Sequence, residues 1–323
     1  MKTKLITDFC LSHSKTIKMK DLKMKTKPLI EQHFHGAFGV DFNKAGADDI
    51  LYLSREIKKH GIGGIFPTLV TDSVENIKSA IENIKSAANR QTKEMAKILG
   101  IHLEGIFLNP QKKGIHNPNQ FLELTKENFQ LVEDDFIKIV TLAPELDKGL
   151  IKYLRGKNIK IQAGHCTGGD LSECDGVTHT FNAMPEITHR GESTALSALM
   201  NDNLYTEIIA DGIHVSNEAL KLLMKSKPAD KIILVSDSLP CTLSKTKEFV
   251  FAGEKVYYDG VKATSKEGTI AGSTTLLPDI IKRLHSIGLF NKKFIDNPYE
   301  YHHCNIDGAI EWDEQMNITN ISF

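Results

Sequence analysis

From residue 28 onward, short apolar runs alternate with longer segments of helical periodicity, and this alternation limits the folds open to the chain. Runs such as IKIV, TEIIA and KIILVSD are continuously apolar, which is typical of strands buried on both faces of a parallel sheet. Helical segments separate the runs, and residues 71–73 and 216–218 supply N-caps. Eight strands are expected over 28–35, 64–70, 98–104, 136–142, 159–165, 176–181, 206–211 and 232–237, with helices over 48–60, 73–88, 146–155 and 216–226. The pattern predicts an α/β protein with a closed (β/α)8 TIM barrel.

The barrel is expected over residues 28–290, between a lysine-rich N-terminal arm (1–27) and a C-terminal tail (291–323). A typical barrel has ~250 residues, so a chain of 323 residues leaves little room for a second full-sized domain. Residues 248–264 alternate around a Tyr-Asp-Gly turn and predict a β-hairpin inserted after the eighth strand, before a closing helix near 275–287. The last thirty residues show no clear periodicity, and no structure is predicted for them.

Composition argues against several classes of partner. The net charge of −1 gives no global field for nucleic acid or an anionic membrane, and the lysine-rich arm is interpreted as solvated. No segment approaches the ~20 apolar residues of a membrane span, and no signal peptide is recognised. The five cysteines, Cys10, Cys166, Cys174, Cys241 and Cys304, contain no CxxC pair. Reduced thiols and a cytoplasmic location are therefore expected.

Potential metal ligands fall at the C-terminal ends of four expected strands: His33 and His35, Glu104, His165 and His179. In a barrel these strand ends converge on one rim. Residues i and i+2 of a strand point the same way, so both imidazoles of the HxH pair can face one site. Each histidine taken alone is more often an incidental or packed residue, but such ligands at four strand ends are less expected by chance. Imidazole and carboxylate together predict zinc or a similar divalent cation.

Asp237 ends the last strand in ILVSDS and is the candidate catalytic residue. An aspartate beside a metal-activated water can take its proton and return it to a leaving group. A divalent cation, this carboxylate and a carbonyl substrate suffice for amide hydrolysis. A Ser-His-Asp mechanism is less favoured, because no GxSxG elbow precedes a helix.

Several stretches, read in order, resemble the N-acetylglucosamine-6-phosphate deacetylases of the amidohydrolase superfamily. They include HFHGAFGVDF, LGIHLEGIFLNPQKKGIHNP, GHCTGGD, THTFNAMPEITHR, IADGIHV and GTIAGS, and they span about residues 31–290. The resemblance implies hydrolysis of N-acetylglucosamine 6-phosphate to glucosamine 6-phosphate and acetate. It also implies that Glu104, His165 and His179 hold the principal metal, with Asp237 as the acid/base. His33 and His35 match the HxH that some members use for a second ion, so one or two ions are expected.

The resemblance also implies a set of substrate-binding residues: Ile115, His116, Asn182, Ala183, Arg190, His214, Ala271, Gly272 and Ser273. Arg190 matches an arginine that grips the substrate phosphate, typically from across the interface of a homodimer. The fixed fork of an arginine suits phosphate oxygens. Arg190 could instead be a surface cation, His214 a packing residue, and Ser273 the cap of the final helix.

The chain departs from the family pattern in three places. Arg190-Gly191-Glu192-Ser193 replaces the usual Arg-Glu-Pro-Gly, and Cys166 replaces a serine beside the strand-five histidine. The short termini predict that the family's small β-sandwich domain is reduced to a remnant around 248–264, or is missing. Two alternatives stay open: an amidohydrolase acting on another N-acyl or cyclic amide substrate, and a non-catalytic degenerate barrel.

Overall fold

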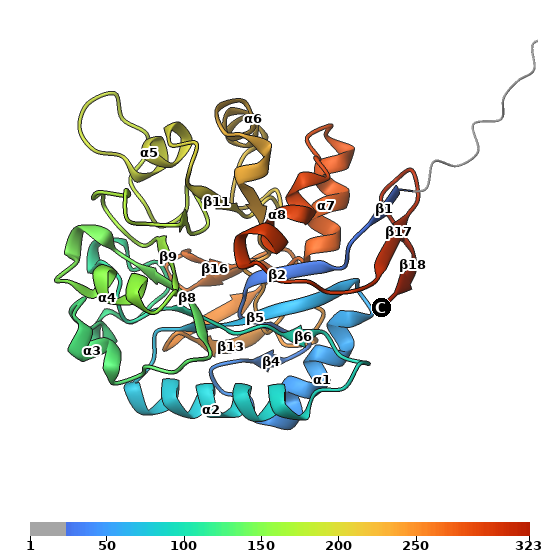
Figure 1. Ribbon diagram of the computed structural model, residues 1–323, viewed down its shortest axis with the longest axis horizontal. Helices are drawn as coiled ribbons and strands as arrows, with labels where there is room; N and C mark the ends of the chain where they lie inside the picture. The colour runs from blue at the N-terminus through green and yellow to red at the C-terminus, as the bar shows by residue number, and fades with distance from the viewer. Residues whose placement is uncertain (1–23) are drawn as a thin grey trace, which may run out of the picture.

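Eight parallel strands form the central sheet of the computed structural model, which describes residues 24–323 (Figure 1). Strands that follow one another in this series along the chain are neighbours in the sheet. They are β2 (Leu29–Phe34), β5 (Ile62–Val70), β7 (Ile101–Glu104), β8 (Ile137–Leu142), β9 (Lys160–Ala163), β10 (Gly176–Val177), β11 (Tyr205–Ile208) and β12 (Ile232–Leu234). A short strand, β6 (Lys97–Ile98), also pairs with β5. Each of the eight lies within or overlaps an expected apolar run, so the strand prediction is confirmed.

Backbone hydrogen bonds between the end of the first strand, β2, and the segment that follows the last strand, β12, close the sheet into a barrel. The backbone of Phe34 forms a parallel bridge with Ser238, just beyond β12. The amide of Asp237 donates to the carbonyl of His33 at 2.9 Å, and the amide of His35 donates to the carbonyl of Ser238 at 3.0 Å. The predicted TIM-barrel class is confirmed, and the closure brings His33, His35 and Asp237 to one seam.

Amphipathic helices cover the outside of the barrel, with α1 and α2 on one side of the view and α5, α6 and α7 on the other (Figure 1). Ser73 and Ser216 cap α2 and α6, as their side chains accept hydrogen bonds from the amides of Asn76 and Ala219. The helices are α1 (Ala47–Lys58), α2 (Val74–Arg90), α3 (Lys126–Gln130), α4 (Leu150–Gly156), α5 (Thr194–Met200), α6 (Asn217–Ser226) and α7 (Leu277–Ser286). Short 3-10 turns occupy Pro110–Lys112, Pro118–Gln120, Pro144–Leu146 and Ala229–Lys231, and β3 (Gly36–Ala37) pairs with β4 (Val40–Asp41).

The hairpin expected over 248–264 is part of a larger four-stranded antiparallel sheet. Its strands are β13 (Glu248–Phe251), β14 (Glu254–Tyr258), β15 (Ala263–Ser265) and β16 (Ile270–Gly272). Phe251 lies in a separate hydrophobic cluster with Val70 and Ile115 of the barrel mouth. The insertion therefore packs over the end of the barrel where the predicted site lies.

The two ends of the described chain pair with each other. Helix α8 (Lys293–His302) and strands β17 (Ala309–Trp312) and β18 (Ile318–Ser322) occupy the segment for which no structure was predicted. β17 also pairs with β1 (Met24–Thr26), so the last part of the expected arm is a strand (Figure 1). Apolar positions alternate only briefly in these strands, which explains why their periodicity was missed. Residues 1–23 of the arm, with Cys10, lie outside the described residues, and the division into arm, barrel and tail remains a prediction.

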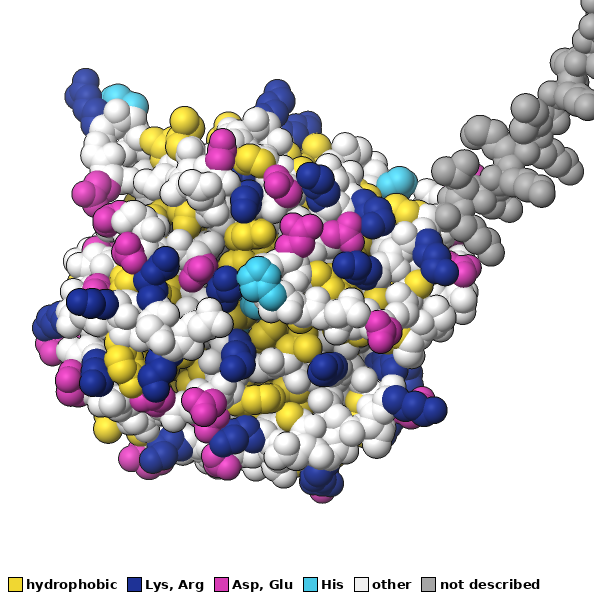
Figure 2. Space-filling model, viewed as in Figure 1, with side chains coloured by type: hydrophobic (Ala, Val, Ile, Leu, Met, Phe, Trp, Pro, Cys, Tyr) yellow, Lys and Arg dark blue, Asp and Glu magenta, His cyan; other side chains and the backbone are white. Residues whose placement is uncertain are grey.

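The face of the molecule drawn in Figure 2 carries Lys and Arg side chains interspersed with Asp and Glu. Among residues 24–323, no helix combines the length and apolar character needed to cross a membrane.

Candidate metal centre and active site

Six side chains predicted from the sequence meet at the carboxyl ends of five strands. All are buried, with at most 7% of each residue exposed. They are His33 within β2, His35 directly after β2, Glu104 at the end of β7, His165 after β9, His179 after β10 and Asp237 after β12. The barrel therefore assembles residues that are far apart in the sequence into one cluster.

Glu104 is at the centre of this cluster and divides its two oxygens between two pairs of histidines. Its Oε1 lies 3.0 Å from Nε2 of His179 and 3.3 Å from Nε2 of His165. Its Oε2 lies 3.1 Å from Nε2 of both His33 and His35. Asp237 completes the second group, with Oδ1 3.0 Å from Nε2 of His35. A carboxylate in this position can bridge two cations.

Hydrogen bonds on the far side of the rings set which nitrogen of each imidazole faces Glu104. Nδ1 of His165 lies 2.9 Å from the carbonyl oxygen of Lys112, and Nδ1 of His35 lies 3.2 Å from that of Thr68. A carbonyl oxygen only accepts, so Nδ1 carries the proton in both rings. With the proton fixed on Nδ1, Nε2 is the nitrogen that would offer a lone pair to a metal, as in histidines that bind metals.

The donor set fits a divalent cation. Buried lone pairs that face carboxylate oxygens at about 3 Å repel unless positive charge lies among them. Nδ1 of His179 is buried and has no hydrogen-bond partner among the described residues, and Nε2 of His33 makes no well-aligned hydrogen bond although it lies 3.1 Å from Oε2 of Glu104. The ligand atoms form two groups, Glu104 with His165 and His179, and His33 with His35 and Asp237, each within 4.8 Å. Nitrogen and carboxylate oxygen ligands in such groups suit zinc and similar ions.

The ionisation of the cluster reflects the same crowding. Burial alone would lower the pKa of His35, but its contacts with Asp237 and Glu104 raise the pKa to about 9. Burial alone would raise the pKa of Glu104, yet the surrounding histidines, His33 first, hold it well below its usual range. The negative charge of Glu104 is therefore stabilised by the histidines that surround it.

Three of the clustered residues have a left-handed backbone conformation that side chains rarely adopt. The φ angles are 49° at His165, 27° at His179 and 53° at Asp237. Such conformations cost ~1–3 kcal/mol each and persist where the surrounding fold enforces them, often at functional sites.

A cavity of about 160 Å³ opens beside this cluster. Most of the predicted substrate residues line it: Ile115, His116, Asn182, Ala183, His214, Ala271 and Gly272. Nδ1 of His116 accepts a hydrogen bond from the amide of Thr71 at 3.3 Å, so Nε2 carries the proton and can donate. Nδ1 of His214 lies 2.8 Å from Oδ2 of Asp211, and this contact raises the pKa of His214 against the effect of burial. His214 therefore lines the cavity and is paired with Asp211, and its role in substrate binding remains a prediction.

Two predicted residues do not line the cavity of the single chain. Arg190 is exposed on the loop before α5, which is stabilised locally by a hydrogen bond from Thr188 to the Arg190 carbonyl. Ser273 is buried, its amide donates to the carbonyl of Asp237 at 2.8 Å, and its hydroxyl accepts from the amide of Thr275. It does not cap α7, so that alternative is wrong. Ser273 supports the backbone of Asp237 instead.

Cys166 lies near the cluster but outside both ligand groups. Its Sγ contacts Oγ1 of Thr194 at 3.4 Å, and burial raises the pKa of the thiol to about 12. The thiol therefore remains protonated at neutral pH, which is unfavourable for metal binding.

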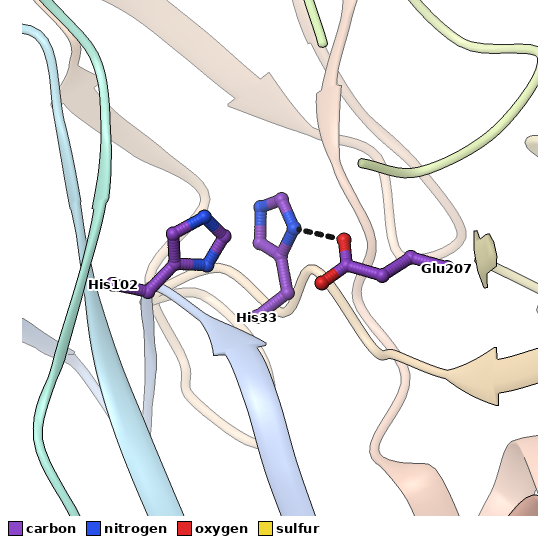
Figure 3. A group of neighbouring side chains, drawn as sticks. All are labelled: His33, His102 and Glu207. Atoms are coloured by element: carbon purple, nitrogen blue, oxygen red, sulfur yellow. Dashed lines mark hydrogen bonds and ion pairs between the residues drawn. The ribbon is translucent and has the colours of Figure 1, made fainter. Parts of the chain in front are cut away.

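Sequence reasoning missed Glu207 in β11, because the run TEIIA was treated as an apolar strand. Glu207 is buried, and its Oε2 lies 3.0 Å from Nδ1 of His33 (Figure 3). Burial opposes ionisation, but hydrogen bonds and charge, those of His33 first, lower the pKa of Glu207 to about 2. A lone glutamate inside an otherwise apolar strand was the available signal, since such a group is costly to bury without partners.

Comparisons with known proteins identify deacetylases of amino-sugar phosphates as relatives, although no protein-family model matches the chain. N-acetylglucosamine-6-phosphate deacetylase of Bacillus subtilis is 34% identical over 261 residues, which cover 76% of this chain and 65% of that protein. N-acetylgalactosamine-6-phosphate deacetylase of Escherichia coli O157:H7 is 28% identical over 277 residues, or 82% of this chain and 73% of that one. The crystal structure of N-acetylglucosamine-6-phosphate deacetylase from Thermotoga maritima superimposes with a TM-score of 0.83 at 23% identity, covering 92% of this chain and 86% of the other. The chain thus spans about two-thirds of the length of the curated relatives it matches.

Proposed function

We propose that this chain, which belongs to the N-acetylglucosamine-6-phosphate deacetylase family, hydrolyses the acetamide of an N-acetylated amino-sugar phosphate. The products from N-acetylglucosamine 6-phosphate are glucosamine 6-phosphate and acetate. The observation that carries the proposal is the meeting of four histidines around Glu104, with Asp237 beside them at the mouth of the barrel.

Glu104, His165 and His179 would hold the principal divalent cation, for which we propose zinc. His33, His35 and Asp237, with the second oxygen of Glu104, would hold a second ion. When bound, such a cation polarises the amide carbonyl and acidifies water.

Asp237 is proposed as the general acid and base. Its carboxylate is buried, and its backbone is held by hydrogen bonds to His33 and Ser273 on either side. From this fixed position it would accept a proton from the attacking water and return it to the leaving amine of the sugar. His116 would donate from Nε2 to a substrate oxygen, since its Nδ1 is already an acceptor.

Recognition of the sugar phosphate is assigned to the rim of the cavity. Asn182, Ala183 and His214 would contact the sugar phosphate, while Ile115, Ala271 and Gly272 would enclose the sugar. Because Arg190 does not reach the cavity of its own chain, we propose that it reaches the cavity of a second copy in a homodimer. Helix α5 beside it exposes Leu196 and Met200, the latter 72% exposed, as an apolar face for such contact. A cytoplasmic location remains a prediction.

The decisive experiment is acetate release from N-acetylglucosamine 6-phosphate by the purified chain, before and after chelation and after addition of zinc. Activity lost on chelation and restored by zinc is expected. Absence of acetate release from the zinc-loaded protein would favour the non-catalytic barrel.

The substrate panel should include N-acetylgalactosamine 6-phosphate, because the Escherichia coli relative is named for that epimer. Unphosphorylated N-acetylglucosamine and other N-acyl or cyclic amides complete it. If one of the latter compounds gave a larger kcat/KM than the sugar phosphates, that compound would become the proposed substrate.

A further inference from the structure

His33 is held from the side opposite the proposed metal centre by a carboxylate on a distant strand. Glu207 is 1% exposed in β11, and its Oε2 lies 3.0 Å from Nδ1 of His33 (Figure 3). The opposite nitrogen of the same ring, Nε2, lies 3.1 Å from Oε2 of Glu104. One imidazole therefore connects Glu207 with the centre.

The other partners of Glu207 determine where the shared proton lies. The side-chain amide of Gln32 donates to Oε1 of Glu207 at 2.6 Å, and the backbone amide of His179 donates to Oε2 at 3.3 Å. The orientation of Gln32 is set in turn by Nε2 of His302 in α8, 2.9 Å from its carbonyl oxygen. Both oxygens of Glu207 are thus acceptors, so the proton between Glu207 and His33 belongs to Nδ1.

We propose that Glu207 is a positioning residue that keeps His33 in the Nδ1–H form, so that Nε2 offers a lone pair to the second cation position. Carboxylates that accept the far proton of a histidine ligand fix its orientation and raise its basicity. This inference rests on the proposed metal centre but not on the identity of the substrate.

An ion bound directly among His33, His102 and Glu207 is the competing explanation, because their ligand atoms also lie close together (Figure 3). Both nitrogens of His102 are already engaged: Nδ1 donates to the carbonyl of Gln32 at 3.0 Å, and Nε2 lies 2.8 Å from Oγ1 of Thr141. The ring packs edge-on against His33 at 4.8 Å between centroids. His102 therefore packs against His33 with both of its nitrogens already hydrogen-bonded. The three residues are better explained as His33 and the two side chains that hold its ring in place than as an ion site.

Glu207→Gln tests the proposal with little change of volume. Whichever way the new amide turns, its NH2 group faces a donor, either His33 or Gln32. Zinc titration calorimetry of the metal-free protein should show the second ion binding about 10- to 100-fold more weakly, with the first ion bound as in the wild type. Thr206→Val on the same strand is the matched control, since its buried hydroxyl has no partner among the described residues, and it should bind both ions normally.

The outcomes are distinct. Equal binding of both ions by wild type and Glu207→Gln would overturn the role of Glu207. A wild type that binds only one ion would remove the second cation position and this inference together, while acetate release by the one-ion protein would leave the proposed activity standing.

A spectroscopic measurement avoids dependence on the folding of any Glu207 variant. In the wild-type protein labelled with 15N-histidine and loaded with zinc, the His33 resonance should show a protonated Nδ1 and an unprotonated Nε2. Its assignment would come from its loss in His33→Asn. Protonation of His33 on Nε2 would overturn the proposal.

Discussion

Glu104 and His179 are 75 positions apart in the sequence, yet Oε1 of one lies 3.0 Å from Nε2 of the other. The contact exists because β7 and β10 end at the same mouth of the barrel, and both residues are almost completely buried there. A carboxylate surrounded by imidazoles in such a position must be compensated by positive charge.

Asp237→Asn should lower kcat by about 100- to 10,000-fold, because the amide cannot accept the proton of the attacking water. The ion held by Glu104, His165 and His179 should remain, since Asp237 is not in that ligand group. Metal analysis and steady-state kinetics on the same preparation provide the measurement. Full activity in the variant would refute the acid/base role.

Arg190→Ala should raise KM for the phosphorylated sugar far more than for unphosphorylated N-acetylglucosamine, because the guanidinium is proposed to grip the phosphate. Arg55→Ala, on the exposed face of α1, is the control for loss of a surface arginine. Equal effects of Arg190→Ala on the two substrates would remove phosphate recognition from its role.

Homodimer formation should be visible by analytical ultracentrifugation, and Met200→Glu should weaken it, because the substitution places charge on the exposed apolar face of α5. Leu243→Glu, which alters an exposed leucine outside α5, is the control. A wild-type chain that remains monomeric at micromolar concentration would contradict the proposed contribution of Arg190 from a second copy.

Glu31→Gln should change how stability depends on pH. Burial raises the pKa of Glu31 to about 8 against hydrogen bonds from Ser236, so the folded protein keeps a proton that the unfolded chain releases near its ordinary value. The resulting stabilisation is complete below that ordinary value and is lost as pH rises to about 8. Relative to Glu31→Gln, the wild type should lose on the order of 4 kcal/mol across this range. Urea unfolding at several pH values measures it, and parallel curves would contradict the shift.

Trp312→Ala should reduce the free energy of unfolding by about 3–5 kcal/mol, because the indole is fully buried in β17. Its Nε1 also donates to Oγ1 of Thr26 in β1 at 2.9 Å. Val261→Ala, at a 64% exposed position, should change stability by no more than about 0.5 kcal/mol. Similar unfolding curves for both variants would show that the terminal sheet contributes little.

The amino-acid sequence by itself determined the eight strands, the main helices and the residues at the strand ends, because continuous apolar runs and helical periodicity are local properties. The same local patterns were too short to reveal β1, β17 and β18, whose pairing depends on residues almost 290 positions apart, such as Met24 and Trp312. Only the tertiary structure placed Glu207 behind His33 and divided the oxygens of Glu104 between two histidine pairs. Barrel closure decides those contacts. It determines which strands become neighbours, and therefore which of their side chains meet.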